Sequence, residues 1–299
     1  MARSFGKVIV LGEHAVVYGV PAIAAGIERG AEAVARRAAH ARVRLVGTQV
    51  PAAIAPELDA AFAALLERLG APPFEVELAL ELPAVAGLGA SAALGVASAR
   101  AVLEALGAPR DDARVLEAAS AWERVFHGNP SGIDAAAAVR GGCFVFTRAR
   151  GIEPLRLGSA VPLVIAIAGP PARTSAMVAR VAELRERRPE LVASALDEVG
   201  ALVTAARTSL EAGDLAELGR LVNENQRVLA TLEVSTPAIE HACSIARAAG
   251  ALGAKLTGSG GGGAVLAVAP DPDPVLAALV GQGFEAFTTV VRPETEASP

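Results

Sequence analysis

The chain has 299 residues, 53% of them hydrophobic and 20% charged, which is the composition of a globular protein with room for one large domain or two ordinary ones. Its formal net charge of −5 argues against nucleic acid as a partner, and no run approaches the ~18 uninterrupted apolar residues of a membrane span. The two cysteines, Cys143 and Cys243, are too few for a disulfide framework, which fits a reduced, cytoplasmic protein.

The first half of the chain alternates predicted strands and helices. Hydrophobic periodicity predicts strands at residues 5–11, 21–27, 41–47, 74–82, 142–147 and 154–157. It predicts helices at residues 56–69, 90–106, 113–126 and 135–139, with Asp111 or Asp112 capping the third of them. Strand 74–82 alternates glutamates with apolar residues, so we expect one of its faces to be exposed. A change of composition near Gly158 predicts domains at residues 1–159 and 160–299.

The second half begins with a predicted strand at residues 161–168 and continues with a long helical region at 175–232, which Pro189 and Gly213 interrupt. The remaining predicted elements are a helix at 237–249, strands at 254–257 and 264–269, a helix at 273–280 and a strand at 284–291. Apart from the extra helices, this is the β-α-β-β-α-β order of a ferredoxin-like fold. The loop 258–263 joins two strands and reads most simply as a flexible hairpin, although it holds more glycines than a hairpin needs.

The central feature of the sequence is the stretch Pro83-Ala-Val-Ala-Gly-Leu-Gly-Ala-Ser-Ala-Ala93, where glycines lead into an apolar helix. Such a loop lets backbone N–H groups and the positive end of the helix dipole approach an anion. Ser91 would stand at the helix start, with Oγ available to a phosphate or a metal. The glycines also match a dinucleotide-binding fingerprint, but the half-exposed strand before them disfavours it. A helix start that merely needs small residues remains the alternative.

For four other residues, the sequence allows either a functional role or an ordinary structural one. Among 27 basic residues only Lys7 and Lys255 are lysines, which suggests sites that need a compact charge, although chance could also explain two residues. Glu123 lies on the predicted helix 113–126, where a solvated glutamate is the ordinary case. Asp134 ends the turn-rich block His127-Gly-Asn-Pro-Ser-Gly-Ile-Asp134 and could simply cap the short helix that follows.

Three glycine-flanked segments resemble, in this order, the three motifs of the GHMP small-molecule kinases. They are Gly6-Lys-Val-Ile-Val-Leu-Gly-Glu-His-Ala-Val-Val-Tyr-Gly19, Pro83 to Ala93, and Lys255-Leu-Thr-Gly-Ser-Gly-Gly-Gly-Gly263. The block ending at Asp134 and the pair Asn225-Gln226 are most similar to the mevalonate kinase branch. The resemblance covers nearly the whole chain. It implies an α/β (α+β) fold of two domains, one like ribosomal protein S5 and one ferredoxin-like.

The resemblance also implies roles for individual residues. Asp134 would meet the substrate hydroxyl as a base, with Lys7 beside it to offset the developing negative charge. Ser91 and Glu123 would be the protein ligands of Mg²⁺, the cofactor that accompanies ATP. The segment that would wrap the ATP phosphates consists of Val85, Ala86, Gly87, Leu88, Gly89, Ala90 and Ser91. The residues on the substrate side would be Lys7, Glu13, His14, Asp134 and Thr174.

These roles imply a cytoplasmic ATP-dependent kinase that phosphorylates the C5 hydroxyl of mevalonate in isoprenoid biosynthesis. Other small alcohols on the same scaffold, such as phosphomevalonate, homoserine or a sugar, remain alternatives. A ligand-binding relative without catalysis is a further alternative, and it predicts damage at Lys7, Ser91, Glu123 or Asp134, which are all intact. ATP and mevalonate are the expected partners, a membrane is not, and a homodimer is left open.

Overall fold

The computed structural model describes residues 1–47, 55–83, 86–127, 132–170 and 172–293 of the chain. The chain folds into two compact units, each built from more than one stretch of sequence. The first unit comprises Met1–Lys7, Gly26–Ala84 and Gly89–Gly141, and the second comprises Val8–Ala25, Val85–Leu88 and Gly142–Pro299. The domain boundary expected after residue 159 stays a prediction.

A four-stranded sheet forms one layer of the first unit, with its strands in the order β1-β4-β6-β5. These strands are β1 (Ala2–Arg3), β4 (Ala31–Arg37), β5 (Arg42–Val46) and β6 (Phe74–Leu80). β4 pairs antiparallel with β6, and β5 pairs parallel with it. Along β6, the buried Phe74, Val76 and Leu78 alternate with partly exposed residues. The half-exposed strand that the glutamates predict is therefore confirmed.

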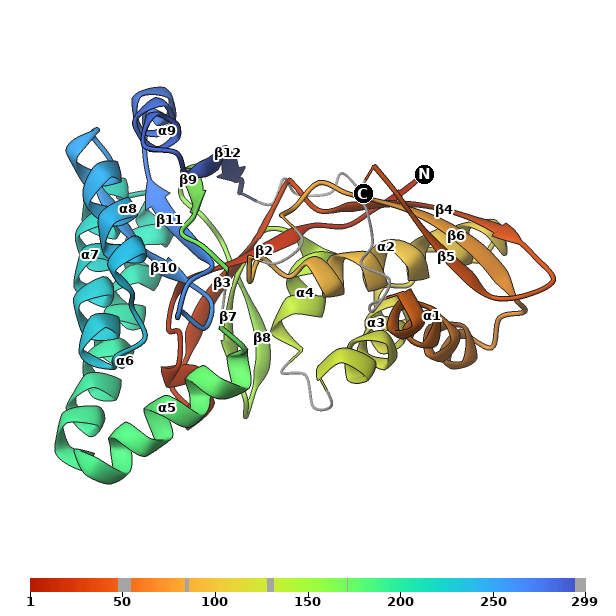
Figure 1. Cartoon of the computed structure of the whole chain (residues 1–299), viewed down its shortest axis with the longest axis horizontal. Coiled ribbons are helices and arrows are strands. Elements are labelled where there is room, and N and C mark those ends of the chain that lie inside the picture. Colours follow the sequence, from red (N-terminus) through yellow and green to blue (C-terminus); the bar gives the residue numbers. More distant parts are fainter. Residues whose placement is uncertain (48–54, 84–85, 128–131, 171, 294–299) are drawn as a thin grey trace. The chain divides into compact units, whose positions relative to one another are not determined.

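Helices form the other layer of the first unit, on one face of that sheet (Figure 1). They are α1 (Ala55–Leu69), α2 (Ala90–Ala105), α3 (Asp112–His127) and α4 (Ile133–Arg140). α2 packs against β4 and β6 and against the other three helices, and most of its residues are buried. At Gly95 a Cβ atom would lie 2.9 Å from the Trp122 ring, so a glycine is needed where α2 and α3 approach. Asp111, rather than Asp112, caps α3 by accepting the N–H of Ala113 at 3.0 Å.

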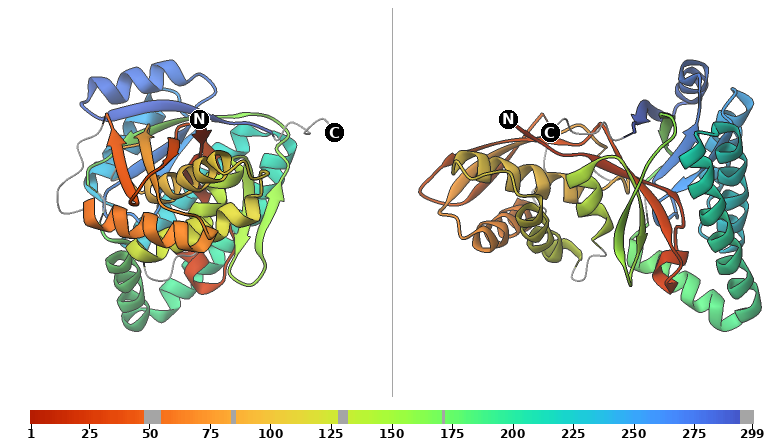
Figure 2. Two further views of the ribbon diagram at one scale, coloured as in Figure 1. Left: turned by 90° about the vertical axis from the view of Figure 1, so that its right-hand side faces the viewer. Right: turned by 180° about the vertical axis from the view of Figure 1, so that it is seen from behind.

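The second unit contains one four-stranded sheet and most of another; Figure 2 shows the sheets from further sides. One has the order β2-β3-β7-β8, with β2 (Gly6–Leu11), β3 (Ala22–Ile27), β7 (Cys143–Thr147) and β8 (Gly151–Leu155), and its strands β2 and β3 each have two residues assigned to the first unit. The other has the order β10-β11-β9-β12, with β9 (Val161–Ile167), β10 (Gly253–Thr257), β11 (Ala264–Val268) and β12 (Glu285–Val291). Its pairings are all antiparallel, with β9 and β11 in the centre. This confirms the predicted ferredoxin-like order.

The second unit also contains the helices α5 (Thr174–Arg187), α6 (Pro189–Ala212), α7 (Leu215–Thr231), α8 (Pro237–Ala248) and α9 (Pro272–Gly281). Of these, α7, α8 and α9 pack on the ferredoxin-like sheet, α6 packs against α7, and α5 packs against α6 (Figure 1). The helical region predicted at 175–232 thus consists of α5, α6 and α7. Pro189 begins α6, and Asp214 caps α7 by accepting the N–H of Glu217 at 3.0 Å. The breaks therefore fall where proline and glycine interrupt the pattern.

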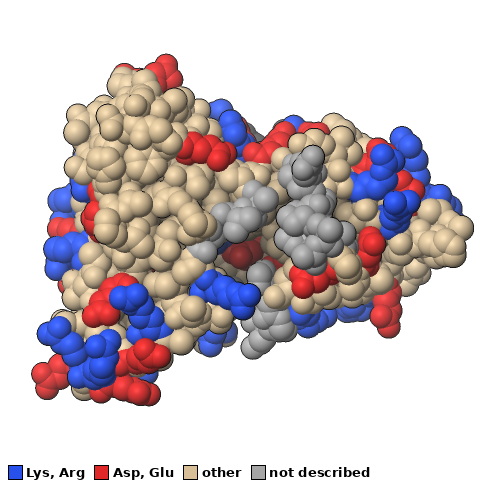
Figure 3. Space-filling model, in the orientation of Figure 1, with Lys and Arg blue, Asp and Glu red and all other residues tan. Residues whose placement is uncertain are grey.

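The surface of the second unit is uneven in charge. In the face that Figure 3 shows, acidic and basic side chains mix over the corner where α5 meets α6, and the surface over α8 and α9 is largely uncharged. The exposed charged residues at this corner include Arg180, Glu183, Arg185, Glu186, Arg187 and Glu190. Because both signs are interleaved there, the corner does not offer the single-sign field that attracts nucleic acid.

Two smaller expectations concern cysteines and membranes. Cys143 and Cys243 are both buried and free, as the absence of a disulfide framework predicts. Within the described residues, no helix combines the length and the apolar character that crossing a membrane requires.

Candidate active site

Lys7 and Asp134 form an ion pair in the first unit. Lys7 lies on β2 and is 5% exposed, and its Nζ is 3.0 Å from Oδ1 of Asp134. Asp134 stands in the first turn of α4, but Gly132 is the capping residue and no side chain caps the helix. The side chain of Asp134 is 40% exposed. A carboxylate that reaches solvent is therefore held by a buried ammonium group. The block 128–131 before it lies outside the described residues.

Ser91 and Glu123 form a second pair in the same unit. Ser91 is in the first turn of α2, which follows Gly89, and its Oγ donates a hydrogen bond of 2.5 Å to Oε1 of Glu123. Glu123 is 3% exposed, so the expectation of a solvated helix glutamate is wrong. The buried Trp122 and the close approach of α2 and α3 turn this face of α3 inward. The pair presents two side chains whose oxygen atoms can ligate a cation, beside the free N–H groups of a helix start.

The segment predicted to hold ATP phosphates has its described residues in both units. Ala86, Gly87 and Leu88 belong to the second unit, where Ala86 and Leu88 are each 1% exposed. Gly89, Ala90 and Ser91 belong to the first unit. Gly89 has φ 76°, and a Cβ atom there would lie 3.2 Å from Cβ of Lys7. Glycine at this position therefore lets the start of α2 pass close to Lys7. Val85 lies outside the described residues.

Glu13 is buried in the second unit and bonded on both carboxylate oxygens. Oε1 pairs with Nζ of Lys255, and Oε2 accepts a hydrogen bond of 3.2 Å from Nδ2 of Asn225. Glu13 is 1% exposed and Lys255 is fully buried. Burial raises the pKa of Glu13, although the Lys255 ammonium opposes that shift. Sequence reasoning missed this pair, and its one signal was the rarity of lysine in the chain.

His14 occupies a strained position next to Glu13. Its φ and ψ of 60° and −45°, with a hydrogen bond of 2.6 Å from the N–H of Ala15 to the carbonyl of Glu13, define a γ-turn of the rare positive-φ form. Nε2 of His14 lies 2.8 Å from the carbonyl oxygen of Ser259. Because a carbonyl only accepts, Nε2 carries the hydrogen, which leaves Nδ1 as an acceptor in the neutral ring. Burial lowers the pKa of His14 and favours that neutral form.

We expect the pH dependence of unfolding to report on His14. Burial lowers its pKa below the ordinary value of 6.5, so the unfolded chain binds a proton that the folded chain does not. Stability rises with pH wherever the unfolded state binds more protons, so the free energy of unfolding should fall as the pH drops below about 6.5. In thermal denaturation between about pH 5 and pH 8, the midpoint temperature should change less steeply with pH in His14→Asn than in wild type. His40→Asn, the same substitution at an exposed position, is the matched control. Equal slopes in wild type and His14→Asn would contradict the expectation.

The glycine-rich loop between β10 and β11 is packed rather than open. All of its five glycines have positive φ, between 69° and 123°. A Cβ atom on Gly260 would lie 2.2 Å from the carbonyl oxygen of Val234, and one on Gly261 would lie 2.7 Å from Sδ of Met177. The loop is a hairpin connection, as expected, but contacts and backbone conformation require its glycines. At Gly258, a Cβ would be 3.6 Å from the carbonyl oxygen of Gly87.

Thr174 begins α5 and is exposed, and Arg173 before it is the capping residue. The same helix start contacts the glycine-rich loop through Ala172 and Met177. The structure thus places Thr174 near that loop within the second unit. Its contact with a substrate stays a prediction.

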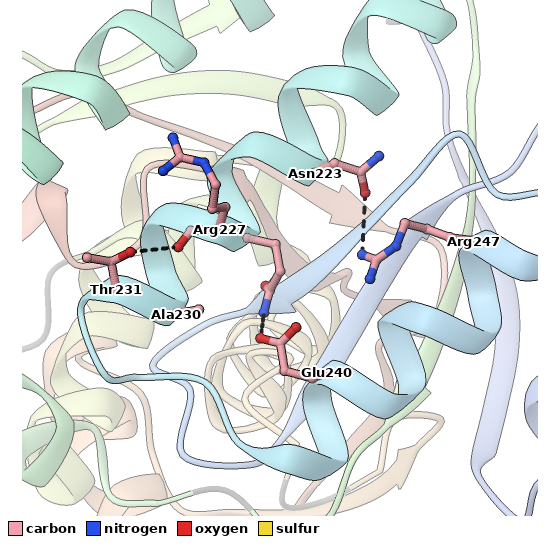
Figure 4. A pocket seen from close by; sticks show the side chains of 7 residues that line it. Asn223, Arg227, Ala230, Thr231, Glu240 and Arg247 are labelled. Carbon is pink, nitrogen blue, oxygen red and sulfur yellow. Dashed lines mark hydrogen bonds between the residues drawn. The ribbon is translucent and has the colours of Figure 1, made fainter.

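A hollow of about 740 Å³ also lies in the second unit, between α7 and α8 (Figure 4). Asn223, Gln226 and Arg227 line it from α7, and Glu240 and Arg247 line it from α8. Nε2 of Gln226 donates a hydrogen bond of 2.8 Å to Glu240, and the Arg247 guanidinium points toward Asn223. None of the predicted site residues lines this hollow. Its size therefore does not make it the reaction site, because the groups suited to phosphoryl transfer lie elsewhere.

Family models and individual relatives place the chain in the same protein family. A model of the GHMP kinase N-terminal domain matches residues 57–142, and a model of the GHMP kinase C-terminal domain matches residues 206–281. The mevalonate kinase of Pyrococcus horikoshii is 34% identical over 98% of this chain and 96% of its own length. That of Aeropyrum pernix is 32% identical, again over 98% of this chain and 96% of its own length.

Solved structures agree with this result. The crystal structure of L. major mevalonate kinase in complex with R-mevalonate has a TM-score of 0.91 and 30% sequence identity, and the match covers 98% of this chain and 96% of that one. The Methanococcus jannaschii mevalonate kinase has a TM-score of 0.85 at 21% identity, with coverage of 99% and 98%, and so supports the fold alone.

Proposed function

This chain belongs to the GHMP kinase family, and we propose that it transfers the γ-phosphoryl group of ATP to the C5 hydroxyl of (R)-mevalonate, giving 5-phosphomevalonate and ADP. The observation that carries this proposal is the similarity to mevalonate kinases over nearly the whole chain, at 34% identity with the enzyme of Pyrococcus horikoshii. The structural match to the L. major enzyme, whose crystals contain R-mevalonate, supports the same substrate.

In the proposed reaction, Asp134 accepts the proton of the mevalonate hydroxyl as its oxygen attacks the γ-phosphorus. Its partly exposed carboxylate can meet a substrate from solvent, while the buried Lys7 ammonium, 3.0 Å away, holds it in place and offsets negative charge on the attacking oxygen. Phosphoryl transfer depends mainly on positioning and charge neutralisation, and two fixed, opposite charges at the hydroxyl supply both for the attacking oxygen. Lys7 could also act by making the hydroxyl more acidic.

The oxygen pair of Ser91 and Glu123 fits the chemistry of Mg²⁺. Mg²⁺ prefers oxygen donors and in kinases is usually held by one or two carboxylates together with phosphate oxygens and water. Within the described part of the chain, no group of three or more histidine, cysteine, aspartate or glutamate side chains could form a complete metal cage. Ser91 and Glu123 would hold Mg²⁺ together with the ATP phosphates, and the bound ion neutralises phosphate charge.

The phosphate groups of ATP would lie along residues 85–91, at the start of α2. The first N–H groups of a helix have no intrahelical acceptors and point outward, which makes this end suitable for an anion. Gly87 and Gly89, with φ of 75° and 76°, let the backbone approach without side chains. The domains at 1–159 and 160–299, the cytoplasmic location and a homodimer stay predictions.

The test is the release of ADP by the purified protein with Mg-ATP and four separate acceptors: (R)-mevalonate, phosphomevalonate, homoserine and galactose. We expect turnover with mevalonate and a product whose mass is that of 5-phosphomevalonate. Turnover with another alcohol and none with mevalonate would keep the kinase assignment and reject the substrate. No turnover with any of the four would favour a non-catalytic relative.

A further inference from the structure

Side-chain hydrogen bonds connect the end of β2 and the turn after it to alternate residues of β10 and the glycine-rich loop. The participating residues of the second segment are Lys255, Thr257 and Ser259. Oγ1 of Thr257 accepts the N–H of Ile9 at 2.8 Å and donates to the Ile9 carbonyl at 3.1 Å. Lys255 pairs with Glu13, and Ser259 accepts from His14. Side chains two residues apart on a strand point to the same side, so Lys255 and Thr257 on one face of β10 hold Glu13 and Ile9, and the Ser259 carbonyl beyond the strand holds His14.

The carboxylate of Glu13 is fully engaged in this network. With 1% exposure and both oxygens bonded, it cannot reach a ligand unless its pair with Lys255 breaks. Lys255 is equally enclosed, since its Nζ also donates to the carbonyl of Leu256 at 2.6 Å. α7 fixes the same strand, because Oε1 of Gln226 accepts the N–H of Leu256 at 2.8 Å. These contacts argue against the direct substrate contact that family resemblance predicts for Glu13.

We propose that the Glu13–Lys255 pair is a positioning device for the substrate side of the reaction, which sets His14 against the glycine-rich loop without itself touching mevalonate. A buried ion pair is seldom kept for stability alone, because desolvation offsets most of its attraction. Here it flanks the strained γ-turn of His14, and such a backbone persists only where its surroundings over-determine it. The pair on one side and the Ser259 carbonyl on the other supply that constraint.

The inference rests on the proposed function for the identity of the substrate. Releasing the pair should let the turn at His14 relax, and small displacements of positioning groups cost up to about 10²-fold in rate. The variants are Glu13→Gln, Lys255→Met and the double variant, in which neither charge is left unpaired. Steady-state kinetics should show kcat/KM for mevalonate lowered about tenfold or more in each single variant, chiefly through KM. Since the two residues act as one unit, kcat/KM of the double variant should be no lower than that of the less active single variant.

Thermal denaturation accompanies the kinetics. Lys255→Met leaves a buried carboxylate without its cation and should unfold at a lower temperature than the double variant. Asn225→Ala keeps both charges and removes one hydrogen bond to Glu13, so it tests the same idea if Lys255→Met fails to fold. We expect it to raise KM for mevalonate about three- to tenfold. Glu217→Gln is the matched control, because it makes the same chemical change in an exposed pair with Arg220 on α7, and its kinetics should equal wild type.

Three results would overturn the inference. Glu13→Gln could lose activity while Lys255→Met keeps wild-type kinetics, the losses could multiply in the double variant, or Asn225→Ala could have an unchanged KM. The first two would indicate that Glu13 contacts the substrate independently of Lys255. An inactive wild-type protein in the same assay would instead reject the proposed function, so the two failures are distinguishable.

Discussion

Replacing Asp134 by asparagine is expected to lower kcat for mevalonate phosphorylation by about 10²- to 10⁴-fold, because an amide cannot take the proton of the attacking hydroxyl. The substitution keeps the shape of the side chain and an oxygen that can accept from Nζ of Lys7, now 3.0 Å from Oδ1. The side chain is 40% exposed, so the fold should tolerate the change, with the thermal midpoint within about 5 °C of wild type. Single-turnover kinetics and a circular dichroism melt measure both quantities.

The control for this prediction is Asp197→Asn, the same change at an exposed position on α6, which should have wild-type kinetics. Lys7→Met in the same series separates two mechanisms. A larger loss in Asp134→Asn favours proton abstraction by the carboxylate, and a larger loss in Lys7→Met favours activation of the hydroxyl by the ammonium group. Near-normal turnover in Asp134→Asn would remove Asp134 from the catalytic machinery.

The parts of the fold with strong periodicity could be predicted from the sequence. The alternation along β6, the helices α2 and α3 and the order of β9 to β12 all follow from patterns within single segments. β4 was missed because its sequence, Ala-Glu-Ala-Val-Ala-Arg-Arg, is rich in alanine, a residue depleted in strands. β1 was missed because its two residues are a strand only through pairing with β4. Such elements depend on tertiary pairing, which a local pattern does not contain.

The candidate site was less predictable from local sequence patterns than the fold. Lys7 and Asp134, and likewise Ser91 and Glu123, lie far apart in sequence, and only the family resemblance suggested their pairing. Local sequence also gave the wrong environment for Glu123, because the packing of α3 against α2 decides which of its faces is buried.

The rarity of lysine was a better guide than any local pattern. Both lysines are buried, and each pairs with a carboxylate: Lys7 with Asp134 and Lys255 with Glu13. An ammonium group is a compact point charge that fits an enclosed site, whereas the planar guanidinium suits exposed, forked contacts such as that of Arg220 with Glu217. In a chain that otherwise uses arginine, each lysine therefore places a buried ammonium group beside a carboxylate.

Replacing Glu123 by glutamine is the prediction with the second largest expected effect. A neutral amide oxygen is a poorer ligand for Mg²⁺ than a carboxylate, so we expect the half-saturating Mg²⁺ concentration to rise about tenfold or more and turnover at low Mg²⁺ to fall accordingly. Glutamine retains an oxygen that can accept from Oγ of Ser91, so the contact between α2 and α3 should survive. Mg²⁺ titrations of ADP release at fixed ATP measure the shift.

The interpretation of Glu123→Gln depends on a comparison with Glu117→Gln on the same helix. Glu117 is exposed and pairs with Arg68, so removing its charge changes the net charge equally but leaves the oxygen pair of Ser91 and Glu123 intact. A rise in the Mg²⁺ requirement confined to Glu123→Gln would assign the effect to direct ligation. Equal shifts in both variants would attribute the effect to long-range electrostatics, which salt screens beyond a Debye length of about 10 Å at 0.1 M. An unchanged Mg²⁺ dependence in Glu123→Gln would contradict its role as a ligand, because loss of a charged oxygen donor must weaken binding of a hard dication.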